Sequence, residues 1–219
     1  MDFSFLPEYY NFFIEGAKLT LYLAFFTVLL GTLLGLLLSL MRLSNNKFLK
    51  LLSSMYVEFL RGTPLLVQIY IIYYGLPSLG IEFSDILAGV IALSINSSAY
   101  VSEIIRAGLE AVDNGQMEAA RSLGMSYGQA MKHIIIPQGF KNILPALGNE
   151  FIVVIKESSI VSVIGLHDLM YNANIIRGNT FRPFEPLIIA ALIYFIMTFT
   201  LSKVLGILER KMKAYDKGM

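Results

Sequence analysis

The feature that most constrains this chain is the length of its apolar runs. Leu19–Met41 contains no charged residue, and Leu187–Leu208 contains only Lys203, near one end. A helix needs about 20 apolar residues to cross a hydrocarbon core of about 30 Å. Only 15% of the residues are charged, whereas a soluble domain usually has about a quarter. We therefore expect an all-α integral membrane protein, in which Lys203 reaches toward the interface.

Three further apolar segments carry polar residues in their middle. They are Leu51–Leu76 with Glu58, Arg61 and Pro64, Ile86–Ile105 with Asn96 and Glu103, and Leu147–Leu166 with Glu150, Lys156 and Glu157. Polar side chains at bilayer depth are costly and rarely face lipid, so we expect these three helices to line an interior. Pro64 predicts a kink in the second helix, because proline removes a backbone donor and clashes one turn back. About five transmembrane helices are expected in all.

The distribution of Lys and Arg in the connections predicts the orientation of these helices. Three segments are basic and are expected in the cytoplasm: the first connection (Arg42, Lys47, Lys50), the third (Arg106, Arg121, Lys132, Lys141) and the C-terminal tail (Arg210, Lys211, Lys213, Lys217). The second connection, Gly75–Asp85, has two acids and no base, and is expected outside. The fourth connection carries two bases, Arg177 and Arg182, and two acids, Asp168 and Glu185, so its charges do not indicate a side of the membrane. Five crossings, with the N-terminus outside, satisfy this pattern.

The N-terminal segment is not typical of a cleavable secretory signal. It carries Asp2, Glu8 and Glu15 instead of a basic region, and the apolar run that follows is too long. We interpret this run as a retained membrane helix, in which Gly31 and Gly35 form a G-x-x-x-G pattern that permits close packing. The chain has no internal repeat and no low-complexity stretch, so residues 1–219 are expected to form a single transmembrane domain.

The cytoplasmic connection between the third and fourth spans, about residues 108–146, is not a polar linker. Asp113 with Gln116 three residues later is an N-cap pattern, and Gly124 follows as a stop, so a short helix is expected over roughly Gly115–Leu123. Ser126 with Gln129 repeats the start signal. A second short helix is therefore expected to run toward Pro137.

Small residues in the first of these helices favour docking against another protein. An interfacial helix on lipid, which is the alternative, would favour basic residues on its polar face. The helix instead carries Ala119 and Ala120 beside Glu118 and Arg121. Small side chains permit close approach of another backbone.

The same segment carries the residues of a known motif. Glu118, Ala119 and Ala120 are followed after three residues by Gly124 and, after nine more, by Ile134-Ile135-Ile136-Pro137. This pattern resembles the EAA motif of bacterial ABC importer permeases, with Ile136 where the family more often has Leu. The resemblance implies a coupling helix, with Glu118, Ala119, Ala120 and Gly124 as the segment that seats in a groove of an ATPase subunit.

Other stretches resemble the polar amino acid branch of these permeases. They are GAKLTL from Gly16, EFLRGTPLLVQ from Glu58 to Gln68, AYVSEIIRAG from Ala99, Pro137-Gln138 and KESS from Lys156. The resemblance covers nearly the whole chain. It implies a type I importer fold in a bacterial inner membrane, with two permease subunits (two copies or close paralogues), two ATPase subunits and an extracytoplasmic solute-binding protein.

The polar residues at membrane depth are candidates for a solute pathway. Asn96, Tyr100 and Glu103 share one helix face, and Glu150 and Glu157 share another. The full candidate set is Glu58, Arg61, Gln68, Asn96, Tyr100, Glu103, Glu150 and Glu157. For any single residue, a structural role is an equally good interpretation. In that case the charges pair with Arg61, Lys156 or Arg106 and only hold the bundle together. The four acids outnumber Arg61 and Lys156, which favours a cationic solute.

Several functions are disfavoured by what the sequence lacks. It has no cysteine and no G-x-x-x-x-G-K-[ST] loop, so ATP and Mg²⁺ are expected on a partner subunit and no cofactor in this chain. No catalytic set suggests an intramembrane enzyme, and His133 and His167 lie far apart in the chain and on opposite predicted sides of the membrane, so a metal site is not expected. Net charge is near zero, which gives no reason to expect nucleic acid. The remaining alternative is an ion-coupled secondary amino acid carrier, although such carriers often show inverted repeats.

Overall fold

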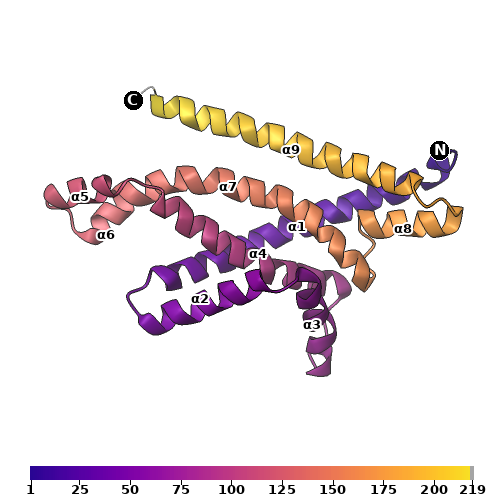
Figure 1. Ribbon diagram of the computed structural model, residues 1–219, viewed down its shortest axis with the longest axis horizontal. Helices are drawn as coiled ribbons and strands as arrows, with labels where there is room; N and C mark the ends of the chain where they lie inside the picture. The colour runs from indigo at the N-terminus through magenta and orange to yellow at the C-terminus, as the bar shows by residue number, and fades with distance from the viewer. Residues whose placement is uncertain (218–219) are drawn as a thin grey trace.

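Helices and short turns make up the whole described part of the chain. The computed structural model describes residues 1–217, with side chains through Met212, so the side chains of Lys213 and Lys217 in the basic tail lie outside the described part (Figure 1). No strand occurs within residues 1–217. The elements are α1 (Leu6–Leu43), α2 (Lys47–Gly62), α3 (Leu65–Ser78), α4 (Asp85–Glu110), α5 (Asn114–Ser122), α6 (Tyr127–Ala130), a π-helical turn (Met131–Ile135), α7 (Ile136–Glu157), a 3-10 helix (Ser158–Ile164), α8 (Leu169–Thr180) and α9 (Glu185–Lys217).

Among the described residues, three helices are long and apolar enough to cross a membrane: α1, α4 and α9. They differ in what surrounds them. In the apolar 18-residue stretch of α4, 72% of the residues are buried, whereas only 6% are buried in that of α9. Helix α4 is therefore the centre of the bundle, and α9 lies at its edge, as Figure 1 shows.

The contact between α1 and α4 depends on small residues. A Cβ atom added at Gly31 would lie 3.1 Å from the Cβ of Ser97, and one added at Gly35 would lie 2.7 Å from the Cβ of Val101. Real Cβ atoms essentially never come as close as the 2.7 Å at Gly35, so this position requires glycine at this helix separation, whereas the 3.1 Å at Gly31 is a tight contact that would make its neighbour shift. The G-x-x-x-G pattern has the packing role that was expected of it.

The predicted second span is not one kinked helix. Helix α2 ends at Gly62, Thr63 and Pro64 are extended, and α3 begins at Leu65. Figure 1 shows α3 leaving the direction of α2 at a steep angle. Proline disfavours the helical conformation in the residue before it, and Gly62 and Thr63 have low helix propensity. The backbone therefore breaks where the sequence predicted only a bend.

The boundaries around the third connection were also wrong. Helix α4 continues to Glu110 and α7 begins at Ile136, so the connection is shorter than the expected 108–146. Pro137 does not end a helix: the helical segment that starts at Tyr127 continues through the π-helical turn Met131–Ile135 into α7, and this turn directly precedes Pro137, where proline disturbs the regular hydrogen-bond pattern. The expected end of the fourth span is a 3-10 helix, which stops at Gly165 with a φ of 82°.

The two ends of the molecule bring together different parts of the chain. At the left end of Figure 1 lie the turn between α1 and α2, the helices α5 and α6, and the C-terminal end of α9. The N-terminus, α8 and the start of α9 lie at the right end. The three segments that were expected in the cytoplasm are therefore at the same end.

Candidate functional site

Two of the candidate pathway residues, Gln68 and Asn96, form a buried joint behind the break in the second span. The Asn96 side-chain amide donates to Gln68 Oε1 at 2.8 Å. Gln68 Nε2 in turn donates to the backbone oxygens of Leu60 (2.8 Å) and Thr63 (3.1 Å). Both side chains are only 5% exposed. Carbonyl groups freed at the end of α2 are thus satisfied by Gln68 of α3, which Asn96 of α4 holds in place, so this pair supports the broken backbone.

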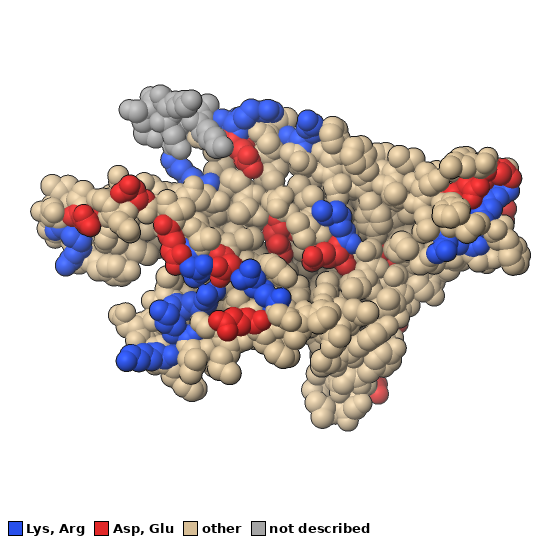
Figure 2. All heavy atoms as spheres, in the orientation of Figure 1, with Lys and Arg blue, Asp and Glu red and all other residues tan. Residues whose placement is uncertain are grey.

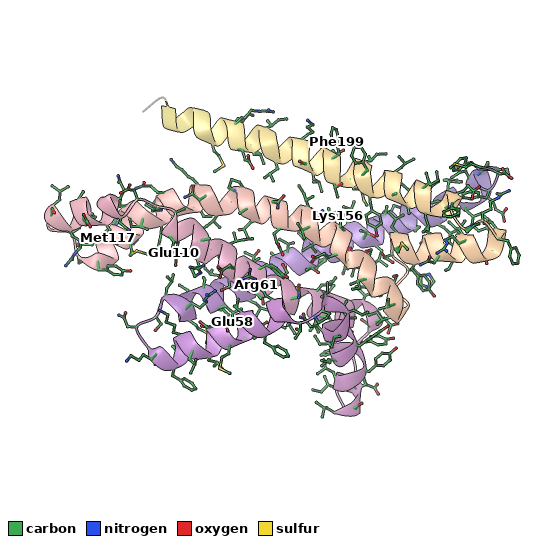
Figure 3. All side chains as sticks on the ribbon, viewed as in Figure 1. Glu58, Arg61, Glu110, Met117, Lys156 and Phe199 are labelled. Carbon is green, nitrogen blue, oxygen red and sulfur yellow. The ribbon has the colours of Figure 1, made fainter. Side chains whose placement is uncertain are left out.

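Glu58, Arg61 and Tyr100 lie on an accessible face. The Arg61 guanidinium carbon is 5.6 Å from the centre of the Tyr100 ring, a cation–π contact between α2 and α4. Glu58, one turn before Arg61, is exposed, and Figure 3 shows both side chains on the side of α2 nearest the viewer.

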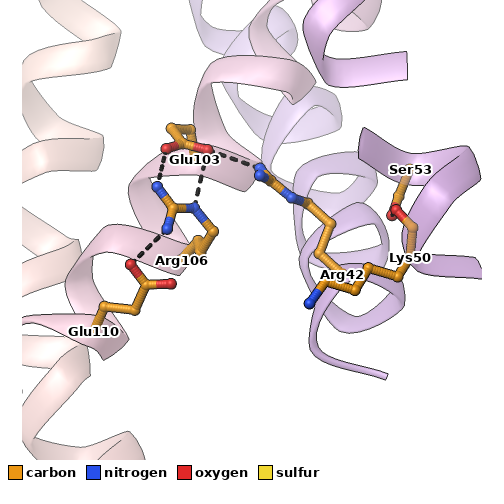
Figure 4. A network of polar contacts seen from close by, with 6 residues as sticks. All are labelled: Arg42, Lys50, Ser53, Glu103, Arg106 and Glu110. Carbon is orange, nitrogen blue, oxygen red and sulfur yellow. Dashed lines mark hydrogen bonds and ion pairs between the residues drawn. The ribbon is translucent and has the colours of Figure 1, made fainter. Parts of the chain in front are cut away.

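Glu103 is held by two arginines, one from another helix (Figure 4). Arg42 at the end of α1 donates to Glu103 Oε2 at 2.7 Å, and Arg106 also pairs with Glu103. Arg106 bonds in addition to Glu110. Glu103 therefore has the structural, ion-paired role that was the alternative to a place in the solute pathway. One of its partners, Arg42, was expected in the first connection and not in the bundle. Because Glu103 is neutralised, the excess of acids over bases among the residues at membrane depth is smaller than expected.

Glu150 and Glu157 differ in their surroundings although they are seven residues apart on α7. Glu150 is 8% exposed and accepts a hydrogen bond from Ser97 Oγ at 2.9 Å. Glu157, the last residue of α7, is exposed, as is Lys156. Glu150 thus ties α7 to α4, and Glu157 is the member of this pair that a solute could reach.

Charged side chains gather on one face of the molecule. Figure 2 shows acidic and basic groups together over α2, α4 and α7, surrounded by other residues. In the same orientation, Figure 3 labels Glu58, Arg61, Glu110 and Lys156 there. We call these four residues, with Tyr100 against Arg61, the charged face. Glu58, Arg61 and Lys156 belong to the predicted spans, where charged side chains are rare and typical of a solute pathway, whereas Glu110 lies at the end of α4, in the expected cytoplasmic connection.

Helix α5 forms where the cap signals predicted it. The Asp113 carboxylate accepts from the backbone N–H of Gly115 at 2.7 Å, and Gly124 has a φ of 85°, as a left-handed stop requires. Ser126 and Gln129 form the capping box that starts α6. The two alanines of α5 are not equivalent: Ala119 is exposed, whereas Ala120 is 4% exposed and packed within this chain. The expectation that both face a partner is therefore wrong for Ala120.

Asp168, outside the candidate set, is a buried acid at the start of α8 that contacts α9. It caps α8 by accepting from the backbone N–H groups of Met170 and Tyr171, and it accepts from the Tyr194 hydroxyl at 3.3 Å. Burial raises the pKa of its carboxyl to about 6. The N-cap preference for Asp before an apolar helix could have identified the cap, but nothing in the sequence indicated its burial.

The arrangement contains no sign of a metal centre: no group of three His, Cys, Asp or Glu residues among those described could hold an ion. Long apolar helices, a buried polar joint and a charged face instead define a helical membrane permease.

Comparison with known proteins gives the family. Residues 28–214 match the family described as binding-protein-dependent transport system inner membrane component. The chain belongs to this family. It is 45% identical over 217 residues to the arginine transport system permease protein ArtQ of Bacillus subtilis (strain 168), covering 99% of each chain. It is 44% identical over 214 residues to the putative glutamine transport system permease protein GlnP of Rickettsia conorii, covering 96% of this chain and 98% of that one.

Solved structures agree with this family. A chain in the crystal structure of an amino acid ABC transporter with histidines is 57% identical and has a TM-score of 0.93, over 96% of this chain and 99% of that one. A chain of the inward-facing MetNI methionine ABC transporter has a TM-score of 0.79 at 16% identity, over 97% of this chain and 99% of that one, and so shares the fold. The resemblance to ABC importer permeases is confirmed, and the chain is an ABC transporter permease. The family does not support the alternative of an ion-coupled carrier.

Proposed function

We propose that this chain forms the translocation pathway of an ATP-driven amino acid importer in a bacterial inner membrane, and that its solute is a cationic amino acid. Amino acids are the solutes named for the relatives above, arginine among them. The complex would contain a second permease subunit, a copy or a close paralogue, together with ATPase subunits that bind ATP and Mg²⁺. An extracytoplasmic binding protein would deliver the solute.

The charged face supports the choice of a cationic solute. Glu58 is exposed there, and no ion pair to it occurs among the described residues, whereas Arg61 beside it is turned to Tyr100. An unpaired carboxylate at membrane depth is costly unless a cation visits it. The exposed carboxylate of Glu58, with no ion pair among the described residues, is the observation that carries the proposal. Glu157 is the second accessible acid of the candidate set, while Glu103 is already neutralised by Arg42 and Arg106.

Helix α5 is proposed as the coupling helix. It projects at one end of the molecule, next to α6 and at the same end as the C-terminal part of α9, with Glu118 and Ala119 exposed. The ATPase would then contact the exposed part of the motif, Glu118 and Ala119, and the left-handed turn at Gly124. Ala120 would pack inside this chain and support the helix. The segment from α4 to α7 would act as one rigid connector between ATPase and pathway within a single transmembrane domain, residues 1–219.

The proposed topology has five crossings and the N-terminus outside, with the broken pair α2 and α3 counted as one crossing. The clustering of the basic segments at one end supports it. The undecided fourth connection is less basic than its sequence suggests, because Arg182 pairs with Asp2.

Uptake by the assembled transporter tests the solute class. Vesicles containing the full complex would receive binding protein loaded with either arginine or glutamine, and uptake per folded complex would be measured. Glu58→Gln should weaken arginine uptake about 10- to 150-fold in apparent affinity, the effect of losing a charge-assisted hydrogen bond, and glutamine uptake much less. Glu15→Gln, an exposed acid paired with Lys18 far from the charged face, should change neither.

Glu103→Gln serves as a contrast, because it removes the ion pair that joins Arg42 of α1 to α4, while Arg106 keeps Glu110, and it should impair both solutes alike. If Glu58→Gln lowers the uptake of arginine and of glutamine equally, Glu58 has a structural role and does not form a site for a cation.

A further inference from the structure

The side chain of Gln138 joins the start of α7 to helix α5. Its Nε2 donates to the backbone oxygen of Ile134, in the π-helical turn, at 3.0 Å, and to Gln116 Oε1 of α5 at 3.3 Å. A backbone carbonyl can only accept, so the contact with Ile134 identifies the NH₂ group of Gln138 as the donor in both hydrogen bonds. The bond between the two helices therefore has a fixed direction, with Gln138 as the donor and Gln116 as the acceptor.

The start of α7 is also packed tightly against the end of α4. A Cβ atom added at Gly139 would lie 2.7 Å from Leu109 Cδ2 and 3.2 Å from Leu109 Cα. A Cβ atom added at Gly108 would lie 2.4 Å from Ile143 Cγ1. Helices in such close contact cannot slide past one another without large shifts. Gln138 directly precedes Gly139, so its hydrogen bond connects α5 to the point where α4 and α7 are held together.

The acceptor of this bond lies on the inner side of α5. Gln116 is one helical turn before Ala120, which is buried within this chain, and the two side chains share a face of the helix. Helix α5 also packs against the π-helical turn and α6. Loss of the hydrogen bond would therefore leave α5 attached to the molecule and change only how firmly its orientation is tied to α7.

We propose that Gln138 is a positioning residue for energy coupling, which holds α5 in a fixed orientation relative to α4 and α7. This inference rests on the proposed role of α5 as the coupling helix. A movement of α5 then reaches the helices that carry the charged face, with Tyr100 on α4 and Lys156 on α7. Without the hydrogen bond, part of that movement is lost at the π-helical turn, although ATP is still hydrolysed.

The same substitution at the two ends of the bond tests this role. Gln138→Glu replaces the donor by a carboxylate that cannot donate, whereas Gln116→Glu keeps an oxygen for the NH₂ group of Gln138. Vesicles containing the full complex with loaded binding protein would be assayed for solute taken up per ATP hydrolysed. We expect Gln138→Glu to lower this ratio about two- to tenfold, the effect of one lost neutral hydrogen bond. Gln116→Glu should not lower it.

A double-mutant cycle separates this contact from general damage to the fold. Gln138→Leu and Gln116→Leu should each lower the ratio, and the double variant should lower it no further, because both changes remove the same bond. The ATPase should co-purify with every variant in the wild-type amount.

Three results would overturn the inference alone: equal losses in Gln138→Glu and Gln116→Glu, additive losses in the cycle, or release of the ATPase from Gln138→Glu. A wild-type complex in which ATP hydrolysis drives no uptake would instead overturn the proposed function, and this inference with it. The wild-type measurement therefore distinguishes the two failures.

Discussion

Gly35 lies where α1 and α4 touch, and its missing side chain decides how close they come. A Cβ atom there would lie 2.7 Å from Val101. Gly35→Ala should therefore lower the free energy of unfolding by about 1–3 kcal/mol, as overpacking usually does. Gly178→Ala, in α8 with open space around it, should instead raise it by about 0.5–1 kcal/mol, because alanine favours a helix. Thermal unfolding in detergent compares them, and stabilisation by both changes would contradict the tight contact.

Asp168 gives a second prediction at this scale, because its pKa differs between the folded and unfolded chain. Burial raises the pKa from 3.8 to about 6, so the folded state binds the proton more tightly. The contribution of Asp168 to stability should therefore be fully present below about pH 4 and be lost as pH rises through about 6, a change of about 3 kcal/mol at most. Asp168→Asn keeps an N-cap oxygen and removes the titration. Its unfolding free energy should lack this fall between pH 4 and 7; an identical pH slope in both proteins would count against the shifted pKa.

At the scale of elements, α5 makes the coupling proposal testable. Ala119 is exposed, so Ala119→Glu should leave the bundle intact and disturb only a docked partner. A bulky charge in a packed contact costs about 2 kcal/mol or more, which corresponds to roughly 30-fold weaker ATPase binding. Ala120 is unsuitable, since it is buried in this chain and its substitution would unfold α5.

Ala111→Glu is the matched control, because Ala111 is an exposed alanine at the end of α4 and outside α5. Co-purification of the ATPase with each variant is the measurement. Normal recovery of the ATPase with Ala119→Glu would remove α5 from the interface.

The elements also show what the sequence could predict. Helix α5 was predicted within about one residue because its cap and stop act locally, through Asp113 and Gly124. The sequence predicts only a kink at Pro64, since nothing local indicates that Gln68 satisfies the freed carbonyls of α2. The second short helix is expected to run toward Pro137, but a π-helical turn carries it through Pro137 into α7, and no local signal in the sequence predicts that turn.

The sequence predicted which residues belong to the candidate site better than it predicted the contacts between them. Helical periodicity placed Asn96 and Glu103 inside the bundle, and both are in polar contacts. Their partners, Gln68 and Arg42, lie 28 and 61 residues away in the chain. Such pairs depend on how helices cross, which one sequence does not contain, so the separation of scaffold carboxylates from accessible ones required the structure.

At the scale of the whole molecule, the topology can be read with single cysteines, because the chain has none of its own. Ser78→Cys at the end of α3 should label only from outside, and Ser122→Cys at the end of α5 only from the cytoplasm. Ser122 is used because Ser126 caps α6. Labelling of both from one side with an impermeant thiol reagent would exclude the proposed five crossings.

The most direct test of the account is ATP-driven accumulation by the reconstituted complex. Vesicles would contain this permease with its ATPase, loaded binding protein outside, and ATP with Mg²⁺ inside. We predict that arginine accumulates only when ATP is hydrolysed, and that an imposed proton or sodium gradient without ATP produces no accumulation. Accumulation driven by the ion gradient alone, with the ATPase absent, would contradict the account and identify the chain as a secondary carrier.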